Sequence, residues 1–270
     1  MTSDLVLDKN NIWVDNELKT ISYPDEGNNT SFEVEEKSFW FQQRNEILKT
    51  VFKRFPYKNN YADIGGGNGF QAKFIADNFS GEVFLLEPGY SGCLNAKKRG
   101  VKNVFNIVFQ KFDFKINNVS AVGLFDVIEH IENDVDFLTQ LKNCLPSDSL
   151  IYITVPAYKF LWSDLDEYGG HYRRYTLSSL KKLATDANLK VVYASYFFAY
   201  LPVITFFLRT LPFKLRSKRK TENILTDAVE QHQPASVITK MFNFFHRKEL
   251  PLIRKKSIPF GASCMVILKT

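Results

Sequence analysis

The chain has 270 residues, of which 45% are hydrophobic, 15% aromatic and 24% charged. This composition is typical of a globular protein and excludes a disordered, collagen-like or repeat-array chain. The formal charge of +6 does not by itself indicate nucleic acid, because anionic lipid or anionic small substrates explain it equally well. The scattered cysteines Cys93, Cys144 and Cys264 argue against a disulfide framework and a cysteine zinc site. Residues 1–10 contain acids and no apolar run, so we expect no signal peptide and a reduced, cytoplasmic setting.

The N-terminal part of the chain divides into two segments. Residues 1–31 are polar and rich in turn-forming residues, and we expect an irregular leader there. Between residues 32 and 58, apolar side chains recur at helical spacing, which predicts an amphipathic helical cap ahead of the main fold.

From residue 59 onward, short apolar strands alternate with helical segments. Strands are predicted at 61–64, 82–86, 104–108, 121–125, 150–155, 191–196 and 262–268, and helices at 71–78, 94–99, 134–144 and 177–187. This alternation predicts an α/β fold with a parallel sheet covered by helices on both faces. Ligands of such sheets bind at the carboxyl ends of the strands, so the residues that follow each strand are the candidates for function.

Residues 197–257 are predicted as an insertion before the last strand. The insertion opens with an apolar, aromatic run and becomes basic between Arg209 and Lys220. The uncharged stretch from Val191 to Leu208 is near the lower length limit for a membrane span. Its first part is expected in the sheet and Pro202 interrupts the rest, so a span is disfavoured. A lid, a dimer interface, a membrane-surface element or a helix packed on the domain remain as alternatives.

Residues 61–70, with the sequence Tyr-Ala-Asp-Ile-Gly-Gly-Gly-Asn-Gly-Phe, carry the strongest chemical signal. Glycines at a strand-to-helix turn let the backbone approach a ligand closely, and the helix N-terminus favours a carboxylate or phosphate. The spacing places Gly65, Gly67 and Gly69 at alternate positions. A dinucleotide fingerprint requires Gly or Ala where Phe70 stands, and a P-loop requires an absent Gly-Lys-Ser/Thr. A tight turn without a ligand is the alternative.

Glu87 strengthens the interpretation of this glycine loop. It follows the second predicted strand of the alternating region, where an acidic side chain can accept two hydrogen bonds from a ribose diol. A solvated loop acid is the alternative. Taken together, the loop and Glu87 indicate an adenosine-type ligand.

The motif Asp63-x-Gly65-x-Gly67-x-Gly69 followed by Glu87 resembles the class I S-adenosylmethionine-dependent methyltransferases. Further similarity lies in Phe-Asp-Val-Ile-Glu-His-Ile at 125–131 and in Thr-Val-Pro-Ala at 154–157. Segments 39–45, 161–167 and 170–176 are similar to a bacterial, type 11 or type 12-like subgroup. The resemblance covers about residues 32–210 and, weakly, 258–270.

The resemblance implies a Rossmann-like, doubly wound sheet of seven mostly parallel strands with an antiparallel last strand. It implies a methyltransferase domain made of residues 59–196 and 258–270, with the N-terminal helical cap and the 197–257 insertion as additions. The implied cofactor is S-adenosyl-L-methionine. The expected cofactor-binding residues are Asp63, Gly65, Gly66, Gly67, Gly69, Glu87, Gln110, Lys111, Phe112, Asp126, Trp40 and Arg44.

Within that set, Asp63 is expected to face the methionine amino group and Glu87 to hold the ribose hydroxyls. The segment Gln110–Phe112 falls where the family reads the adenine. Asp126 is expected at the border between cofactor and acceptor. Trp40 could cover the cofactor or belong to the core.

Methyl transfer needs alignment and exclusion of water, and a neutral hydroxyl acceptor usually needs a base, whereas a carboxylate or an enol does not. The candidate bases are His171 and His130, each with a structural role as the alternative. Acceptor-binding candidates are Trp162, Arg173, Arg174 and Tyr175. Ion pairs with Asp164, Asp166 and Glu167 are the alternative for the two arginines. No metal-binding spacing is found in the sequence.

The sequence therefore predicts a methyltransferase acting on a small-molecule or lipid- or glycan-linked acceptor. The alternatives are an NAD(P)-dependent oxidoreductase, which Phe70 disfavours, and a non-catalytic scaffold that retains the cofactor pocket. Nucleic acid is disfavoured as a partner, because the basic residues lie beside an apolar run rather than among interleaved aromatics. A peripheral contact with the inner membrane surface through residues 197–220 and a homodimer are further expectations.

Overall fold

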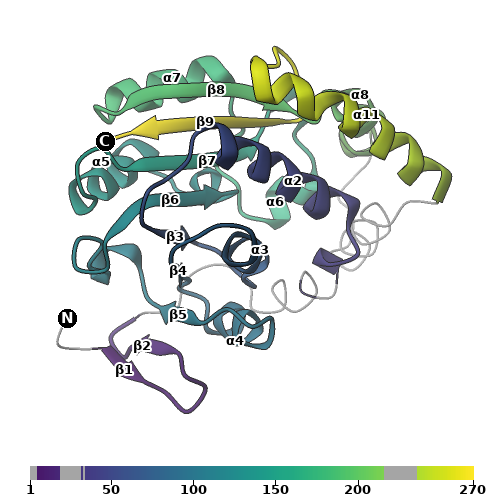
Figure 1. Ribbon diagram of the computed structural model, residues 1–270. Helices are drawn as coiled ribbons and strands as arrows, with labels where there is room; N and C mark the ends of the chain where they lie inside the picture. Colours follow the sequence, from purple (N-terminus) through teal and green to yellow (C-terminus); the bar gives the residue numbers. More distant parts are fainter. Residues whose placement is uncertain (1–4, 19–31, 33, 216–235) are drawn as a thin grey trace.

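The computed structural model describes residues 5–18, 32, 34–215 and 236–270. Within them one nine-stranded sheet has the strand order β1-β2-β5-β4-β3-β6-β7-β9-β8 (Figure 1). The strands are β1 (Leu5–Leu7), β2 (Trp13–Asp15), β3 (Asn60–Ile64), β4 (Val83–Leu86), β5 (Asn103–Asn106), β6 (Val119–Phe125), β7 (Leu150–Pro156), β8 (Lys190–Phe197) and β9 (Ser263–Lys269). The five central strands β5, β4, β3, β6 and β7 run parallel, and β9 is antiparallel to both β7 and β8.

The mostly parallel sheet with an antiparallel last strand agrees with the prediction, but the expected number of seven strands is wrong. The two extra strands, β1 and β2, lie in the segment that we expected to be an irregular leader. The Asp8 carboxylate accepts hydrogen bonds from the Asn10 and Ile12 backbone amides, at 2.8 and 2.9 Å, and so closes the hairpin. Strand β2 then pairs in parallel with β5 at the sheet edge. The rest of the leader, residues 19–31, lies outside the described residues.

Helices cover both faces of the sheet. The helices are α2 (Phe39–Arg54), α3 (Phe70–Asn78), α4 (Tyr90–Lys98), α5 (Asp134–Cys144), α6 (Asp164–Tyr168), α7 (Leu177–Asp186), α8 (Leu201–Thr205), α9 (Leu211–Leu215) and α11 (Ser236–Lys255). Short helical turns are η1 (Phe109–Lys111), η2 (Ile128–His130), η3 (Lys159–Leu161) and the π-helical η4 (Phe206–Thr210).

Two buried clusters form the core, one on each side of the sheet. Residues Ala62 and Ile64 of β3 pack toward α5 and α7, whereas Tyr61 packs toward α2, α3 and α4. This alternation follows from the two-residue period of a strand. Helix α2 belongs to the second cluster, because Ile47 and Val51 are fully buried there. The helix expected in the N-terminal cap is thus anchored directly on the sheet.

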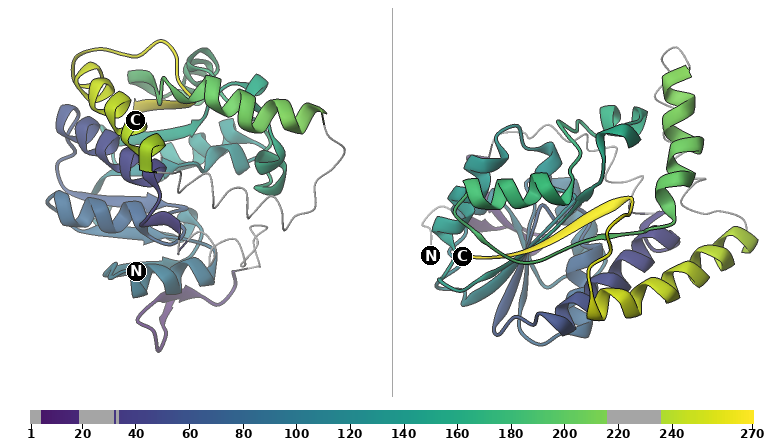
Figure 2. Two further views of the ribbon diagram at one scale, coloured as in Figure 1. Left: turned by 90° about the vertical axis from the view of Figure 1, so that its right-hand side faces the viewer. Right: turned by 90° about the horizontal axis from the view of Figure 1, so that it is seen from above.

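The insertion before β9 contributes two helical elements. Helices α8 and α9, joined by η4, continue as one rod that projects beyond the edge of the sheet (Figure 2). Helix α11 returns alongside α2, where the Phe242 and Phe39 rings lie 4.7 Å apart. Residues 216–235 of the insertion lie outside the described residues. None of the described helices combines the length and the apolar character that a membrane span requires.

Gly123 of β6 allows the central strands to hold a large tyrosine. A Cβ atom at this position would lie 1.8 Å from the Tyr61 hydroxyl and 2.7 Å from the Phe125 ring. The buried Tyr61 hydroxyl has no hydrogen-bond partner among the described residues. We predict that Gly123→Ala lowers the free energy of unfolding by about 1–3 kcal/mol through overpacking. Tyr61→Phe should not lower the free energy of unfolding, because it removes a buried hydroxyl that has no partner.

The double variant Gly123→Ala/Tyr61→Phe should recover part of the loss, and urea unfolding of the four proteins measures this coupling. Strictly additive effects would show that the two side chains do not compete for the same space.

Candidate functional site

Three acidic side chains meet at the carboxyl edge of the parallel strands. Asp63 lies near the end of β3, Glu87 directly follows β4, and Asp126 directly follows β6. Because β4, β3 and β6 are neighbours in the sheet, these residues lie at one edge. Helices packed on opposite faces diverge there, which makes this edge the usual ligand site of such folds.

The glycine loop between β3 and α3 leaves open space above its backbone. Gly67 has a left-handed backbone, with φ of +50°, and a Cβ atom added there would have no neighbour within 4 Å. By contrast, a Cβ at Gly69 would lie 2.8 Å from the Ala96 Cβ, and one at Gly65 would lie 3.0 Å from Val127. Gly65 and Gly69 are therefore required by packing, whereas Gly67 faces room for a ligand.

Glu87 is bound to this loop. Its carboxylate accepts hydrogen bonds from the backbone amides of Gly67 at 2.8 Å and Gly89 at 2.6 Å. Burial raises the pKa of Glu87, and these two amides act in the opposite direction. Asn106 fixes the adjacent backbone, because its side-chain amide donates to the carbonyl oxygens of Glu87 and Pro88.

Asp63 lies beneath the loop as a buried carboxylate without a partner. The residue is 1% exposed, and neither carboxylate oxygen has a hydrogen-bond partner among the described residues. Burial raises the pKa of Asp63 to about 7, although the Arg44 cation lowers it. A Cβ atom at Gly66 would lie 2.7 Å from the Asp63 carboxylate, so the loop passes directly over it. An unpartnered buried carboxylate fits a ligand that brings a cationic donor.

Arg44 brings the N-terminal helix α2 into the site. The residue is 3% exposed, and its guanidinium forms an ion pair with Asp126. The guanidinium carbon lies 4.4 Å from the centre of the Trp40 ring and 5.1 Å from that of Phe41. The sequence-predicted residues Arg44, Trp40 and Asp126 are thus brought together.

A set of hydrogen bonds that the sequence analysis did not predict holds the glycine loop from its outer side. The Arg99 guanidinium donates to the Glu35 carboxylate and to the Asn68 carbonyl oxygen, each at 2.7 Å. The Asn68 side chain also donates to Glu35, at 3.2 Å. The position of Asn68 within the glycine motif could have indicated a role in holding the loop. Nothing in the sequence, however, connects Asn68 to Glu35 or Arg99.

The segment expected to read the adenine makes its side-chain contacts elsewhere. Gln110 bonds to the exposed Gln140 at 3.0 Å, and Lys111 lies 3.4 Å from Glu17. The Phe112 ring is buried in the core. The adenine-binding role of these residues stays a prediction that the contacts do not support.

The two histidines predicted as candidate bases lie next to each other, and His171 is close enough to Asp126 to lower its pKa. The His130 and His171 rings are 4.7 Å apart, and the His171 Nδ1 atom lies 2.9 Å from an Asp166 carboxylate oxygen. The Arg174 guanidinium binds the two oxygens of Asp166 at 2.7 and 2.8 Å. Although burial opposes ionisation, the hydrogen bonds from His171 and Arg174 hold the pKa of Asp166 well below its usual range. Burial, with His171 nearby, lowers the pKa of His130 to about 4.

The residues predicted to bind the acceptor make contacts within the protein. Arg174 is committed to Asp166, and Arg173 lies 2.7 Å from Asp134. Tyr175 is buried and donates its hydroxyl to Asp134 at 2.8 Å. These contacts favour the alternative of internal ion pairs for the two arginines, and acceptor binding by Arg173, Arg174 and Tyr175 stays a prediction. Trp162 is half-buried just before α6, and its acceptor-binding role stays a prediction.

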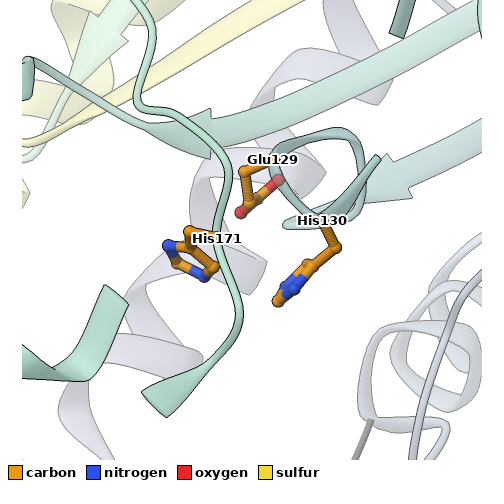
Figure 3. A group of neighbouring side chains, drawn as sticks. All are labelled: Glu129, His130 and His171. Atoms are coloured by element: carbon orange, nitrogen blue, oxygen red, sulfur yellow. The ribbon is translucent and has the colours of Figure 1, made fainter. Parts of the chain in front are cut away.

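Glu129 joins the histidine pair. One carboxylate oxygen of Glu129 and one ring nitrogen each of His130 and His171 all lie within 4.8 Å of one another (Figure 3). The sequence shows no metal-binding spacing here, because His171 is brought in from a distant loop. The fold, and not the spacing in the chain, assembles these three side chains.

Comparisons with known proteins identify the fold. A family model of a methyltransferase domain matches residues 36–194. The phosphoethanolamine N-methyltransferase 2 of Haemonchus contortus, solved with S-adenosyl-L-methionine, has 15% identity and a TM-score of 0.56; the match covers 92% of this chain and 57% of that one. The plantazolicin methyltransferase BpumL, solved with S-adenosylhomocysteine, has 14% identity and a TM-score of 0.55, with 91% and 89% coverage.

A third similar structure is the apo form of the mycolic acid cyclopropane synthase CmaA1, with 11% identity, a TM-score of 0.52, and coverage of 91% of this chain and 98% of that one. This chain thus spans little more than half of the Haemonchus enzyme. At such low identities the similarity establishes the fold alone. No curated protein is significantly similar in sequence.

The buried carboxylate of Asp63 makes stability depend on pH. In the unfolded chain Asp63 ionises near pH 4, whereas the folded protein retains the proton until about pH 7. The pH-dependent part of the cost of burying Asp63 is therefore absent below pH 4, and it grows as the pH rises to 7. We predict that Asp63→Asn becomes more stable relative to the wild type across this window, by roughly 2–4 kcal/mol.

Urea unfolding at pH 4.5 and 8 measures the difference, with Glu46→Gln on the exposed face of α2 as the control. A difference that stays constant with pH would contradict the assignment.

Proposed function

This chain belongs to the class I S-adenosylmethionine-dependent methyltransferases, and we propose that it methylates a small-molecule or lipid- or glycan-linked acceptor by in-line displacement. S-adenosylmethionine is its cofactor. The observation that carries the proposal is the unpartnered Asp63 carboxylate beneath a glycine loop that opens onto space at Gly67. The acceptors of the similar enzymes are not transferred to this chain. The acceptor class that we propose is argued from the exposed side chains of this chain.

The residues present fit the cofactor. Asp63 would bind the methionine ammonium group, because a buried anion without a partner is stabilised by a cationic donor. Glu87 would bind the ribose hydroxyls, since it already stands at the strand end with two acceptor oxygens. When bound, the cofactor supplies a methyl group activated by a sulfonium. The protein holds the acceptor in line and excludes water.

His171 is the better oriented of the two candidate bases. Asp166 accepts the hydrogen on His171 Nδ1, which leaves the lone pair on Nε2. We assign Asp126 to the border between the cofactor and the acceptor, beside these histidines. Arg44 holds the Asp126 carboxylate in place from α2.

The oxidoreductase and scaffold alternatives gain no support from the described residues. Phe70 stands at the start of α3, where a dinucleotide motif needs a small residue, and its ring lies 5.6 Å from that of Phe41. The residues that we propose for cofactor binding are present at the site, which gives no reason to infer a scaffold.

A lipid-linked acceptor is favoured by the apolar surface of the rod that α8, η4 and α9 form. Val203, Phe207, Leu208 and Leu215 are each at least 58% exposed. Phe244 and Phe245 of α11 are also exposed, and the Lys248 ammonium lies 5.7 Å from the centre of the Phe244 ring. Exposed aromatic and aliphatic side chains next to lysines fit a membrane interface that contains anionic lipid.

We predict that Gly67→Asn weakens binding of S-adenosylmethionine and S-adenosylhomocysteine at least tenfold. Asparagine tolerates the left-handed backbone, and its side chain would enter the open space above the loop. Glu87→Gln should also weaken binding about tenfold or more, because one charged acceptor is lost. Calorimetry measures the affinity of each variant for the two ligands. NADPH serves as the control ligand and should not bind.

Gly100→Asn is the matched control, because Gly100 has φ of +90° at the end of α4, outside the site. Equal losses in the Gly67 and Gly100 variants would mean that the effect is one of folding and not of the site.

We predict that Phe207→Ser/Leu208→Ser reduces co-sedimentation with phosphatidylglycerol vesicles at least tenfold, because it removes exposed apolar contacts. Ile116→Ser, at an exposed residue outside the insertion, is the control and should bind as the wild type does. High salt should also weaken binding. A change in molar mass instead of vesicle binding would make this surface a dimer interface.

A further inference from the structure

The cluster of Glu129, His130 and His171 combines three good metal ligands from two parts of the fold. Glu129 and His130 belong to η2, directly after β6, and His171 belongs to the loop before α7. Their ligand atoms lie within 4.8 Å of one another. The side chains converge on one space between the two segments (Figure 3). Around a metal with bonds of about 2.0–2.1 Å such atoms stand about 3.4 Å apart, so the ligands need to close in by up to about 1.4 Å.

Glu129 supplies an independent indication that something binds here. It is fully buried, and neither carboxylate oxygen has a hydrogen-bond partner among the described residues. Its carboxylate points toward the His171 ring (Figure 3). Buried carboxylates without partners are rare, because they lose hydration and gain nothing in return. A cation between the three side chains would satisfy this group.

The outer contacts of both histidines are those of metal ligands. His171 Nδ1 is bound to Asp166, which is itself held by the Arg174 guanidinium. The His130 ring is hydrogen-bonded to the backbone of Gly169. In metal sites a ligating imidazole usually donates its other ring N–H to a carboxylate or a backbone carbonyl, which fixes the ring and its tautomer. His171 has this arrangement through Asp166, and the contact with Gly169 likewise orients the His130 ring.

We propose that Glu129, His130 and His171 form a site for a divalent transition-metal ion, which binds an oxygen of the methyl acceptor. Two imidazoles and one carboxylate favour zinc, manganese, cobalt or nickel over magnesium and calcium. Three protein ligands leave coordination positions open for water or for substrate. Metal binding by these three residues is independent of the proposed function. Binding of an acceptor oxygen to the metal rests on the proposed function.

The position of the cluster connects it to methyl transfer. Val127, two residues before Glu129, packs on the glycine loop, because a Cβ at Gly65 would lie 3.0 Å from its side chain. The cluster is therefore adjacent to the proposed cofactor site on its acceptor side. The acceptor is then an oxygen nucleophile, and a second oxygen next to it would chelate the ion.

A metal-bound hydroxyl is acidified, and its proton leaves to water. The oxygen pair forms the new bond to the methyl carbon, and the pair of the broken carbon–sulfur bond returns to sulfur. In this arrangement His171 is a metal ligand, and the ion takes over the activation that an imidazole base would provide.

The test is metal binding by the full chain, without any acceptor. We expect chelator-treated protein to bind one equivalent of Co²⁺, with a visible absorption band, and Zn²⁺ to displace it. Glu129→Gln and His171→Ala should each weaken Co²⁺ binding at least 100-fold, and Asp166→Asn should weaken it about 10–100-fold as an outer partner. His246→Gln, at a buried histidine of α11 outside the cluster, should bind as the wild type does.

Thermal unfolding of each variant separates loss of binding from loss of fold, and Glu129→Gln keeps the shape of the side chain. Absence of Co²⁺ binding in the wild type, or equal binding by the folded Glu129→Gln variant, would overturn the metal site. Calorimetry of S-adenosylhomocysteine on the same metal-free protein keeps the two proposals apart. Cofactor binding without metal binding leaves the proposed function intact and removes this one, whereas metal binding without cofactor binding supports the site and removes its role in methyl transfer.

Discussion

The buried guanidinium of Arg44 is the charge on which the carboxyl edge of the sheet depends. Asp63 and Glu129 are buried there and Asp126 is half-buried, and the Arg44 cation lowers the pKa of each of them against the effect of burial. Without a cation, three carboxylates in so small a volume could not ionise together. The ion pair of Arg44 with Asp126 also links α2 to the sheet, because Arg44 belongs to α2 and Asp126 follows β6. Removing one partner of such a buried pair generally costs more than the pair contributes.

The position of that guanidinium is determined by apolar packing one turn away. Ile47, Leu48 and Val51 are fully buried against the sheet, and they fix both the height and the rotation of α2. Arg44, three positions before Ile47, then points to the strand ends, and Trp40 lies one further helical turn earlier, beside the Arg44 guanidinium. The helix that precedes the alternating strands in sequence is therefore part of the site. A cofactor bound at the glycine loop would be enclosed between the sheet and this helix.

The sequence predicts most of the scaffold because its signals are local. The helix Asp134–Cys144 begins and ends where the pattern indicates, since Asn133 accepts a hydrogen bond from the Asp136 amide at its start. The three-residue strands β1 and β2 were missed, because so short a strand has no measurable period. At the site, the glycine loop and Glu87 were found from their spacing. The sequence did not show that Asp166 is the partner of Arg174, because several acidic residues lie equally near in the chain. Glu129 and His171 are likewise joined only by the fold.

The hairpin that begins the described chain has a consequence for how copies of the protein meet. Strand β2 covers β5 along its open side, with the Trp13 and Phe105 rings stacked 6.2 Å apart. The row of backbone donors and acceptors that β5 would offer to a neighbour is occupied there by the protein's own chain. Two molecules could pair through β5 only after this hairpin had detached. Among the described strands the two outermost are β1, with three residues, and β8, with eight, and Ile258 already covers Tyr196 of β8 through an isolated bridge. The two edges of the sheet thus offer a neighbour only a short strand at one side and a partly covered strand at the other.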